Sequence, residues 1–218
     1  MGMLIDGRWT DEDQTIQNGS FVRATSAFAK PVKAQSVRAM EAEPGRFHLI
    51  ASLSCPWSHR STLTLAIKCL EHSIPVHIAH GPRTEGYRLG TRERPWKVPG
   101  ADVEIEHLHE LYRLAAPTYT GRVTVALLWD AERLVIVSNE STHILRGLDA
   151  VAVAGCQDWT LRPDRLASEI DETSNWIHRT LNNGVYRAGK ARRQDVYDAA
   201  VDEVFETLDQ LDARLSKS

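Results

Sequence analysis

Short apolar runs alternate with helical stripes along the middle of the chain. The segment Arg46–Ser54 is short, apolar and rich in strand-forming residues, and apolar residues recur at near-helical spacing from His59 to Leu70. The elements predicted after these two are a strand over Ser73–His80, a loop over 81–104, a helix over Ile105–Ala115, strands over Val123–Trp129 and Leu134–Val137, and a helix over Asn139–Leu148 with Ser138 or Asn139 as its N-cap. This order is typical of a thioredoxin-like unit, in which an antiparallel hairpin extends a parallel pair of strands.

Two longer amphipathic stripes follow. Apolar residues repeat at intervals of three and four over Pro163–Asn182, where Asn183-Gly184 ends the pattern, and again over Gln194–Leu215. The N-terminal residues show no sustained period, so we predict an irregular arm whose aromatic residues dock parts of it on the body. We therefore predict an α/β thioredoxin-like domain followed by a partial all-α domain. The expected boundaries are an arm at 1–46, the thioredoxin-like domain at 47–148, a linker at 149–162 and the helical domain at 163–218.

Composition and charge narrow the class of protein. Hydrophobic residues make up 42% and charged residues 25% of the 218 positions, which is an ordinary globular balance. The formal net charge of −3 argues against a broad basic footprint for nucleic acid. The sequence contains no run of about 18 apolar residues and no recognisable secretory leader, so we expect no membrane partner and a cytoplasmic location.

Three cysteines occur, at positions 55, 69 and 156. We expect no disulfide framework from so sparse and odd a set. Cys69 falls among apolar residues of a predicted helix and is expected in the core, whereas Cys156 is expected to be an exposed bystander. No cysteine or histidine spacing matches a zinc site, so we expect no metal.

Cys55 is the leading candidate for chemistry because it lies where a predicted strand turns into a helix. The free N–H groups and partial positive charge of a helix N-terminus stabilise a thiolate, and thiolates attack sulfur. His59 and Arg60 add positive charge one turn later. Position 58 is serine, so a second thiol must come from a small molecule or another protein. The alternative is that Cys55 is an inert, buried small residue.

Five segments together resemble one known family. They are SLSCPWSHRS (52–61), LYRLAAPTYTGRVTV (111–125), LWD (128–130), IVSNES (136–141) and LNNGVYRAG (181–189). In this order they resemble the glutathionyl-hydroquinone reductases, the xi class of the glutathione transferase superfamily. The opening MGMLIDGRW and Ser26-Ala27-Phe28 resemble the family's N-terminal arm, so the similarity runs over nearly the whole chain. The resemblance implies a thioredoxin-like domain followed by a glutathione-transferase helical domain, in a C-terminally shortened relative.

The resemblance also implies a reaction. In the family a cysteine attacks the sulfur of a glutathionyl-hydroquinone, the hydroquinone leaves, and a second glutathione frees the enzyme as glutathione disulfide. Cys55 matches the nucleophile, and Tyr186 matches the tyrosine that exchanges a proton with the aromatic carbon. The positions that match the glutathione site are Tyr87, where the family has a tryptophan that packs on glutathione, Arg122, Val123, Thr124 and Val125, which line it, and Glu140 and Ser141, which hold the γ-glutamyl end. Glutathione is thus the implied co-substrate and a small aromatic thioether the implied substrate, and the resemblance leaves a homodimer open.

Without the resemblance, several of these residues have plainer interpretations. Glu140-Ser141 is an ordinary helix N-cap with an acidic first turn, and Tyr186 is an aromatic residue at a helix end that covers a core edge. The loop Gly81–Val103 departs from the family's spacing, and its arginines either attract an anionic ligand or form a solvated charged surface. Those arginines are Arg83, Arg88, Arg92 and Arg94.

One departure bears on the backbone of the site. The family has a cis-proline where this chain has Ala126. A cis bond before alanine costs about 3 kcal/mol, so we expect the Val125–Ala126 peptide to be trans unless packing forces the other form.

Three hypotheses for the function remain. The first is a thiol-dependent reductase or transferase that uses glutathione. The second is the same chemistry with another small thiol, or a specialised lyase or isomerase in a biosynthetic pathway. The third is a non-catalytic binding module. The presence of Cys55, Tyr186, Glu140 and Ser141 together argues against the third.

Overall fold

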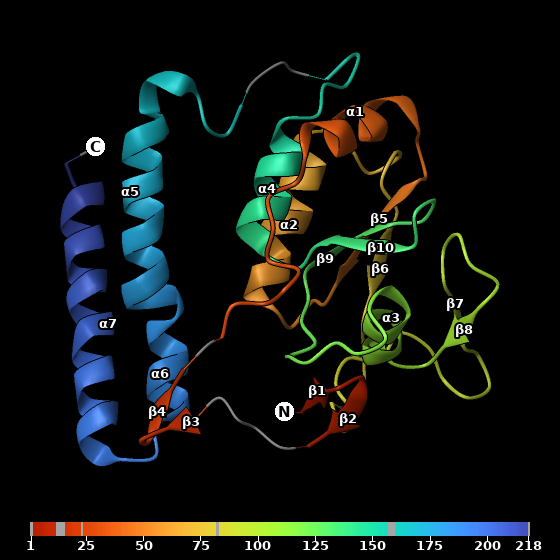
Figure 1. Ribbon diagram of the computed structural model, residues 1–218. Coiled ribbons are helices and arrows are strands. Elements are labelled where there is room, and N and C mark those ends of the chain that lie inside the picture. Colours follow the sequence, from red (N-terminus) through yellow and green to blue (C-terminus); the bar gives the residue numbers. More distant parts are fainter. Residues whose placement is uncertain (1, 12–15, 23, 82, 157–159, 218) are drawn as a thin grey trace. The chain divides into compact units, whose positions relative to one another are not determined.

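The computed structural model describes residues 2–11, 16–22, 24–81, 83–156 and 160–217 (Figure 1). The chain divides into two compact units. Unit 1 comprises Met1–Asp13 and Thr25–Leu161, and unit 2 comprises Gln14–Ala24 and Arg162–Ser218. Each unit is described by itself below.

A mixed four-stranded sheet forms the centre of unit 1 (Figure 1). Its strand order is β10 (Val135–Ser138), β9 (Leu127–Asp130), β5 (Phe47–Ala51) and β6 (Val76–Ile78). β5 pairs in parallel with β6 and antiparallel with β9, and β9 pairs antiparallel with β10. All five residues of β5 are buried because it is paired on both edges and covered on both faces, which explains its continuous apolar run. The predicted thioredoxin-like architecture is confirmed.

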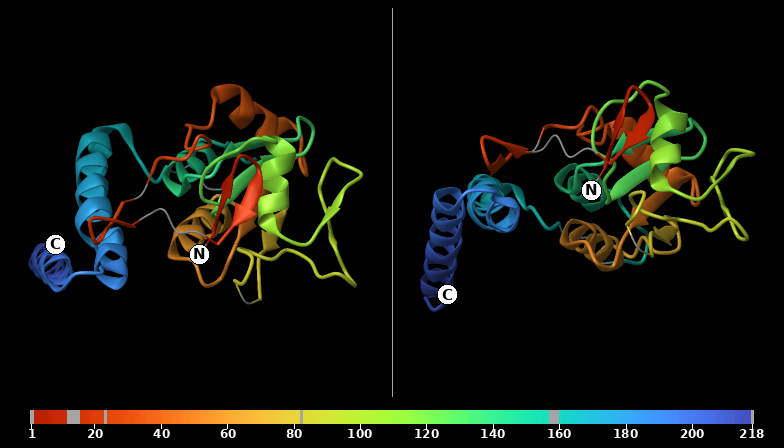
Figure 2. Two further views of the ribbon diagram at one scale, coloured as in Figure 1. Left: turned by 60° about the horizontal axis from the view of Figure 1, so that its bottom comes forward. Right: turned by 90° about the horizontal axis from the view of Figure 1, so that it is seen from below.

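Helices cover both faces of this sheet. α2 (Pro56–Ile67) and α4 (Ser141–Asp149) lie together on one face, and α3 (Leu108–Ala115) lies on the other (Figures 1 and 2). The main hydrophobic core joins side chains of the sheet to α2, α4 and a further helix, α1 (Ala34–Ala42). Its buried members are Met40, Phe47, Leu49, Leu65, Leu70, Ile74, Ala126, Leu128, Ile144, Leu148 and Val151.

The N-terminal arm and the loop at 81–104 are more regular than predicted. The arm contains α1 and two short antiparallel pairs, β1 (Met3–Ile5) with β2 (Arg8–Thr10) and β3 (Ile16–Gln17) with β4 (Ser20–Phe21). The loop contains the pair β7 (Trp96–Lys97) and β8 (Glu104–Ile105). Strands of two or three residues are too short to show a period, and α1 buries only Met40 in a polar stretch, so hydrophobic periodicity carries little sign of these elements.

Unit 2 is helical. Its elements are the short turn η1 (Asp164–Leu166), α5 (Ala167–Ile177), the π-helical turn η2 (His178–Asn182), α6 (Gly184–Lys190) and α7 (Gln194–Leu215). The bounds predicted for α7 are confirmed. The single helix predicted over Pro163–Asn182 is instead three segments, and the predicted stop at Asn183-Gly184 is the start of α6. β4 lies against α6 (Figure 2).

Gly184 is required by packing rather than by a turn. A Cβ at this position would lie 2.7 Å from Cγ2 of Val204 on α7, so the glycine allows α6 and α7 to approach closely. Among the described residues, no helix is both long and apolar enough to span a bilayer.

Candidate active site

Cys55 occupies the predicted position between strand and helix. β5 ends at Ala51, and Cys55 is the N-cap of α2 with Pro56 as the first helical residue. Proline is favoured there because the missing N–H has no helical partner. Cys55 is a free cysteine, only 6% exposed, and its Sγ lies 3.7 Å from the carbonyl oxygen of Val125. The thiol therefore sits at the positive end of the α2 dipole, against the segment that the family resemblance predicts to line a ligand.

The segment 122–125 lies beside Cys55 and is held from behind by Tyr112 of α3. The Tyr112 hydroxyl donates to the carbonyl oxygen of Thr124 at 3.0 Å and accepts from the Thr124 N–H at 3.2 Å. Burial raises the pKa of Tyr112 to about 12, so its proton is retained throughout the physiological range. Val123 and Val125 are buried. The backbone of this segment is therefore fixed by a buried hydroxyl that makes both a donor and an acceptor contact.

A polar network continues from Tyr112 into the N-terminal arm. The side-chain amide of Asn139 donates to the Tyr112 hydroxyl at 3.0 Å and to the Ser26 hydroxyl at 2.8 Å. The Ser26 and Tyr119 hydroxyls lie 3.2 Å apart, and Tyr119 donates to the carbonyl of Arg122. The arm thus braces the candidate ligand segment.

The peptide between Val125 and Ala126 is cis. The expectation of a trans bond was wrong. The trans preference is that of an isolated peptide, whereas Ala126 is 1% exposed and belongs to the core cluster, where its surroundings decide the conformation.

Glu140 and Ser141 form the N-terminus of α4. Glu140, rather than Ser138 or Asn139, is the N-cap, and its Oε1 accepts from the Thr142 N–H at 3.4 Å. The Glu140 carboxylate accepts from an N–H group at the helix start that has no partner within the helix. The N-cap therefore lies one residue after Asn139, the later of the two predicted positions. The guanidinium of Arg60, on α2, donates to the Ser141 hydroxyl through Nε at 3.0 Å and Nη2 at 2.7 Å. The nucleophile's helix and the Glu140–Ser141 pair are therefore joined directly.

Tyr87 lies on the loop that follows β6. It is half-buried, and the Arg83 guanidinium lies 4.5 Å from the centre of its ring. Arg83 Nη2 also donates to the hydroxyl of Ser54, the residue before Cys55, at 2.6 Å. The structure therefore brings this part of the loop to the Cys55 turn, while Arg92 and Arg94 are exposed.

Tyr186 belongs to unit 2. It lies in the first turn of α6, half-buried, with its ring centre 6.4 Å from that of Phe21. The ammonium group of Lys190 also lies 4.6 Å from the centre of the Phe21 ring. Tyr186 is therefore part of an aromatic contact between α6 and β4.

Comparisons with known proteins place the chain in one enzyme family. No family model matches it. It is 38% identical to glutathionyl-hydroquinone reductase YqjG of Escherichia coli over 226 residues, which cover 100% of this chain and 69% of the relative. It is also 38% identical to glutathionyl-hydroquinone reductase PcpF of Sphingobium chlorophenolicum, covering 99% of this chain and 68% of that protein. The chain belongs to the glutathionyl-hydroquinone reductase family.

Solved structures agree with this assignment to the xi class of glutathione transferases. A xi-class transferase from Natrialba magadii superimposes with a TM-score of 0.81 at 35% identity, covering 99% of this chain and 66% of that one. The glutathione-bound structure of Escherichia coli YqjG gives a TM-score of 0.76 at 37% identity, with coverage of 99% and 67%. This xi-class transferase chain thus spans about two thirds of the length of the relatives it matches.

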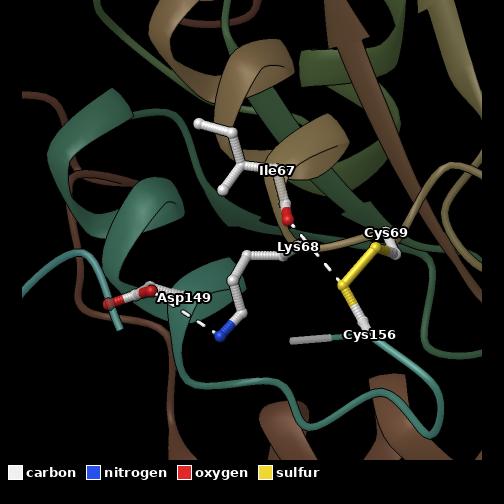
Figure 3. The surroundings of a disulfide bond; sticks show 5 residues. All are labelled: Ile67, Lys68, Cys69, Asp149 and Cys156. Carbon is white, nitrogen blue, oxygen red and sulfur yellow. Dashed lines mark hydrogen bonds and ion pairs between the residues drawn. A yellow bond between two sulfur atoms is a disulfide. The ribbon is translucent and has the colours of Figure 1, made fainter. Parts of the chain in front are cut away.

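The remaining two cysteines of this xi-class chain form a disulfide, so the expectation of no disulfide was wrong. Cys69 and Cys156 are joined with their Cα atoms 6.1 Å apart, although 87 residues separate them in sequence (Figure 3). Cys69 is exposed rather than in the core because α2 ends at Ile67 and the chain turns there through a positive φ of 55°. Sequence spacing cannot reveal a pairing over so long a loop.

An ion pair lies beside this disulfide. Lys68 Nζ is 3.8 Å from Oδ1 of Asp149, and both side chains are buried (Figure 3). Asp149 also accepts from the Thr160 hydroxyl at 2.7 Å and from the Leu161 N–H at 2.9 Å. The disulfide and Asp149 together tie the end of unit 1 to α2 and α4.

Three potential metal ligands come together at the start of α3. One ligand atom each from Glu85, His107 and His109 lies within 4.8 Å of the others. The buried His109 has Nε2 3.2 Å from the Glu85 carboxylate, and burial lowers the pKa of His109. The ring of His107, however, accepts the backbone N–H of Glu110 as the α3 cap. A metal-bound imidazole normally donates a hydrogen bond from the nitrogen that does not bind the metal, whereas in His107 that nitrogen would be the acceptor of the cap. We therefore assign no metal to this cluster.

Sequence reasoning does not reach the residues that position the site. Tyr112 and Asn139 belong to two different predicted helices, and nothing in the sequence around either residue indicates that their side chains are in contact. Arg60 stands out in the sequence only as positive charge near Cys55. Its contact with Ser141 joins positions 81 residues apart, which spacing along one chain does not reveal.

Proposed function

We propose that this chain is a glutathione-dependent reductase that removes glutathione from glutathionyl-hydroquinones or related aromatic thioethers. The observation that carries the proposal is Cys55, the free cysteine at the N-cap of α2, set against Val125 in a chain that shares 38% identity with glutathionyl-hydroquinone reductases. The proposal also rests on the motifs around Cys55, Glu140-Ser141 and Tyr186 quoted above.

The reaction proceeds in two steps, and in each step a thiolate attacks the sulfur atom of a glutathionyl group. The Cys55 thiolate attacks the thioether sulfur, the carbon–sulfur bond breaks, and the aromatic carbon takes up a proton to leave as the hydroquinone. The enzyme is left with a Cys55–glutathione disulfide. A second glutathione thiolate attacks the glutathione sulfur of that disulfide, which releases glutathione disulfide and regenerates the Cys55 thiolate.

Each residue has a distinct part in this scheme. The N-terminus of α2 stabilises the thiolate of Cys55. The segment 122–125 lines glutathione, Tyr87 packs against it, and Glu140 with Ser141 holds its γ-glutamyl end. Tyr186 supplies the proton to the carbon, since a carbanion is otherwise a poor leaving group.

The test is the mass of the intact protein after incubation with glutathione disulfide. An adduct of one glutathione on Cys55 is expected, and Cys55→Ser should show none and should lose turnover of a glutathionyl-hydroquinone by at least about a thousandfold. Because Cys55 is only 6% exposed, the rate of its alkylation by iodoacetamide measures access to the sulfur independently. Unchanged turnover in Cys55→Ser would overturn the proposal, and adducts only with a different biological thiol would reassign the co-substrate.

Tyr186→Phe separates the two halves of the mechanism. Thioether cleavage needs a proton on carbon, whereas attack on glutathione disulfide does not. The variant should therefore lose turnover of the glutathionyl-hydroquinone by about a hundredfold or more while forming the Cys55 adduct from glutathione disulfide at the wild-type rate. Tyr197→Phe, on an exposed position of α7, is the matched control. Equal losses in both assays would remove the acid role from Tyr186.

A further inference from the structure

We propose that Arg60 is a positioning residue that sets the donor and acceptor directions of the Glu140–Ser141 pair, and thereby makes the site selective for thiols that carry a γ-glutamyl group. This inference rests on the proposed function. It assigns to Arg60 a part beyond the general positive charge expected from its place in the sequence.

The contacts of Arg60 converge on the start of α4. Its guanidinium donates twice to the Ser141 hydroxyl, at 3.0 and 2.7 Å, and once to the Thr142 hydroxyl at 2.5 Å. Nη2 also lies 3.6 Å from Oε1 of Glu140. The guanidinium carbon is 5.2 Å from the centre of the Trp57 ring, which is 8% exposed. The planar fork is thus held on one face by a buried indole and is directed at three consecutive residues.

These contacts determine what the Ser141 hydroxyl can offer a ligand. A serine hydroxyl has two acceptor lone pairs and one proton. The two Arg60 N–H groups occupy both lone pairs, so the hydroxyl can only donate in any further contact. Within the described part of the chain, the acceptor that faces this hydroxyl is Oε1 of Glu140 at 3.5 Å, a long bond that a ligand carboxylate can replace. Arg60 therefore prepares Ser141 to donate to an anion.

Arg60 acts on Glu140 in a complementary way. Among the described residues, the hydrogen bonds and the ion pair of Glu140 with Arg60, Ser141 and Thr142 are all made by Oε1. Oε2 is accordingly the oxygen that remains for a ligand cation. A carboxylate acceptor and a hydroxyl donor side by side match the ammonium and the carboxylate of an α-amino acid. The γ-glutamyl end of glutathione carries both groups, whereas cysteinylglycine carries no such end.

The experiment compares glutathione disulfide with cysteinylglycine disulfide as donors to Cys55. In each case the Cys55 thiolate attacks the disulfide, one thiolate leaves, and a mixed disulfide forms, which intact mass measures over time. The wild type should react faster with glutathione disulfide by at least about tenfold. Arg60→Gln should lower this preference about tenfold and leave the cysteinylglycine rate within about twofold of wild type. Arg60→Lys, which retains the charge without the fork, should recover only part of the preference.

Two further variants test whether Arg60 acts through Ser141. If it does, Arg60→Gln combined with Ser141→Ala should discriminate no worse than Ser141→Ala alone. Arg113→Gln, at an exposed arginine on α3, is the matched control and should retain the wild-type preference.

The outcomes separate this inference from the proposed function. A wild type that forms no adduct with either disulfide overturns the proposed function itself. A wild type that discriminates, together with an Arg60→Gln variant that discriminates equally, overturns the role of Arg60 and leaves the function standing. Equal loss of both rates in Arg60→Gln also contradicts the inference, because it shows an effect on Cys55 or on folding rather than on the γ-glutamyl end.

Discussion

Tyr112 shows how one buried hydroxyl can fix the backbone of a site. It is fully buried, and its oxygen is shared among the Thr124 carbonyl, the Thr124 N–H and the Asn139 amide. The ring packs edge-on against Phe28 of the arm, with ring centres 5.6 Å apart. Positioning of the candidate ligand segment therefore depends on a residue that is not itself among those proposed to bind glutathione or to react.

Tyr112→Phe should destabilise unit 1 by about 1–3 kcal/mol, because the Thr124 N–H and the Asn139 amide each lose a partner in a buried setting. Urea unfolding measured by tryptophan fluorescence gives the difference. The same change at the exposed Tyr197 is the control and should shift stability by less than about 0.5 kcal/mol. An unchanged midpoint in Tyr112→Phe would show that these hydrogen bonds contribute nothing net.

At the scale of elements, the close approach of α6 and α7 depends on Gly184. Gly184→Ala should destabilise unit 2 by about 1–3 kcal/mol because the new Cβ lies 2.7 Å from Val204 Cγ2. A Cβ added at Gly189, in the same helix, would have no atom of the described residues within 4 Å, so Gly189→Ala should stabilise by about 0.5–1 kcal/mol through helix propensity. Hydrogen exchange of the α6 and α7 amides reports both. Opposite signs are the expected result, and equal effects would contradict the packing argument.

Hydrogen bonds between side chains join three strands of unit 1, and each side chain in the series donates to the next. The Trp96 indole N–H, on β7, donates to Nδ1 of His77 on β6 at 3.2 Å, so the His77 proton is on Nε2. Nε2 of His77 lies 3.0 Å from Nδ1 of His48 on β5 and donates to it. Burial, together with the neighbouring His77, lowers the pKa of His48 to about 4. A proton added at His48 Nδ1 would face another donor.

Stability should therefore fall as the pH drops from about 6.5 to about 4. The unfolded chain takes up the His48 proton near its ordinary pKa of 6.5, whereas the folded chain resists until the pKa of about 4, so the difference amounts to up to about 3 kcal/mol. Unfolding in urea at a series of pH values measures this slope. His48→Gln should flatten the slope, and His72→Gln, at an exposed histidine, is the control. An equally steep slope in His48→Gln would refute the assignment.

Some elements and contacts of this fold can be predicted from the sequence, and others cannot. α7 follows from an uninterrupted apolar stripe, and the place of Cys55 follows from a cysteine–proline step after a buried strand, because both signals are local. α1 escapes prediction because its stretch is polar and buries only Met40. The contacts of Tyr112 with Asn139 and of Arg60 with Ser141 escape it because they join distant parts of the chain and depend on how elements pack.

For the molecule as a whole, the Cys69–Cys156 disulfide joins positions 87 residues apart and closes a loop that contains most of the sheet. A cross-link over so long a loop restricts the unfolded chain strongly. Unit 1 is therefore expected to have a stability that depends on the oxidation state of these two cysteines and not only on its core.

Cys69→Ser combined with Cys156→Ser should lower the free energy of unfolding of unit 1 by about 2–4 kcal/mol. Treatment of the wild type with dithiothreitol should give a similar loss, and denaturant titration measures both. Formation of the Cys55 adduct from glutathione disulfide should persist in the double variant, because neither cysteine takes part in it. Stability equal to that of the oxidised wild type would contradict the cross-linking argument.

Glutathione, the proposed co-substrate, can also attack the Cys69–Cys156 disulfide. A solution rich enough in glutathione to sustain turnover at Cys55 also supplies the thiolate that opens a disulfide elsewhere in the same chain. Air-oxidised and thiol-treated samples then differ in whether the Cys69–Cys156 disulfide is closed. A difference in rate between them would combine the effect of the disulfide on the rigidity of the fold with any effect on the chemistry at Cys55.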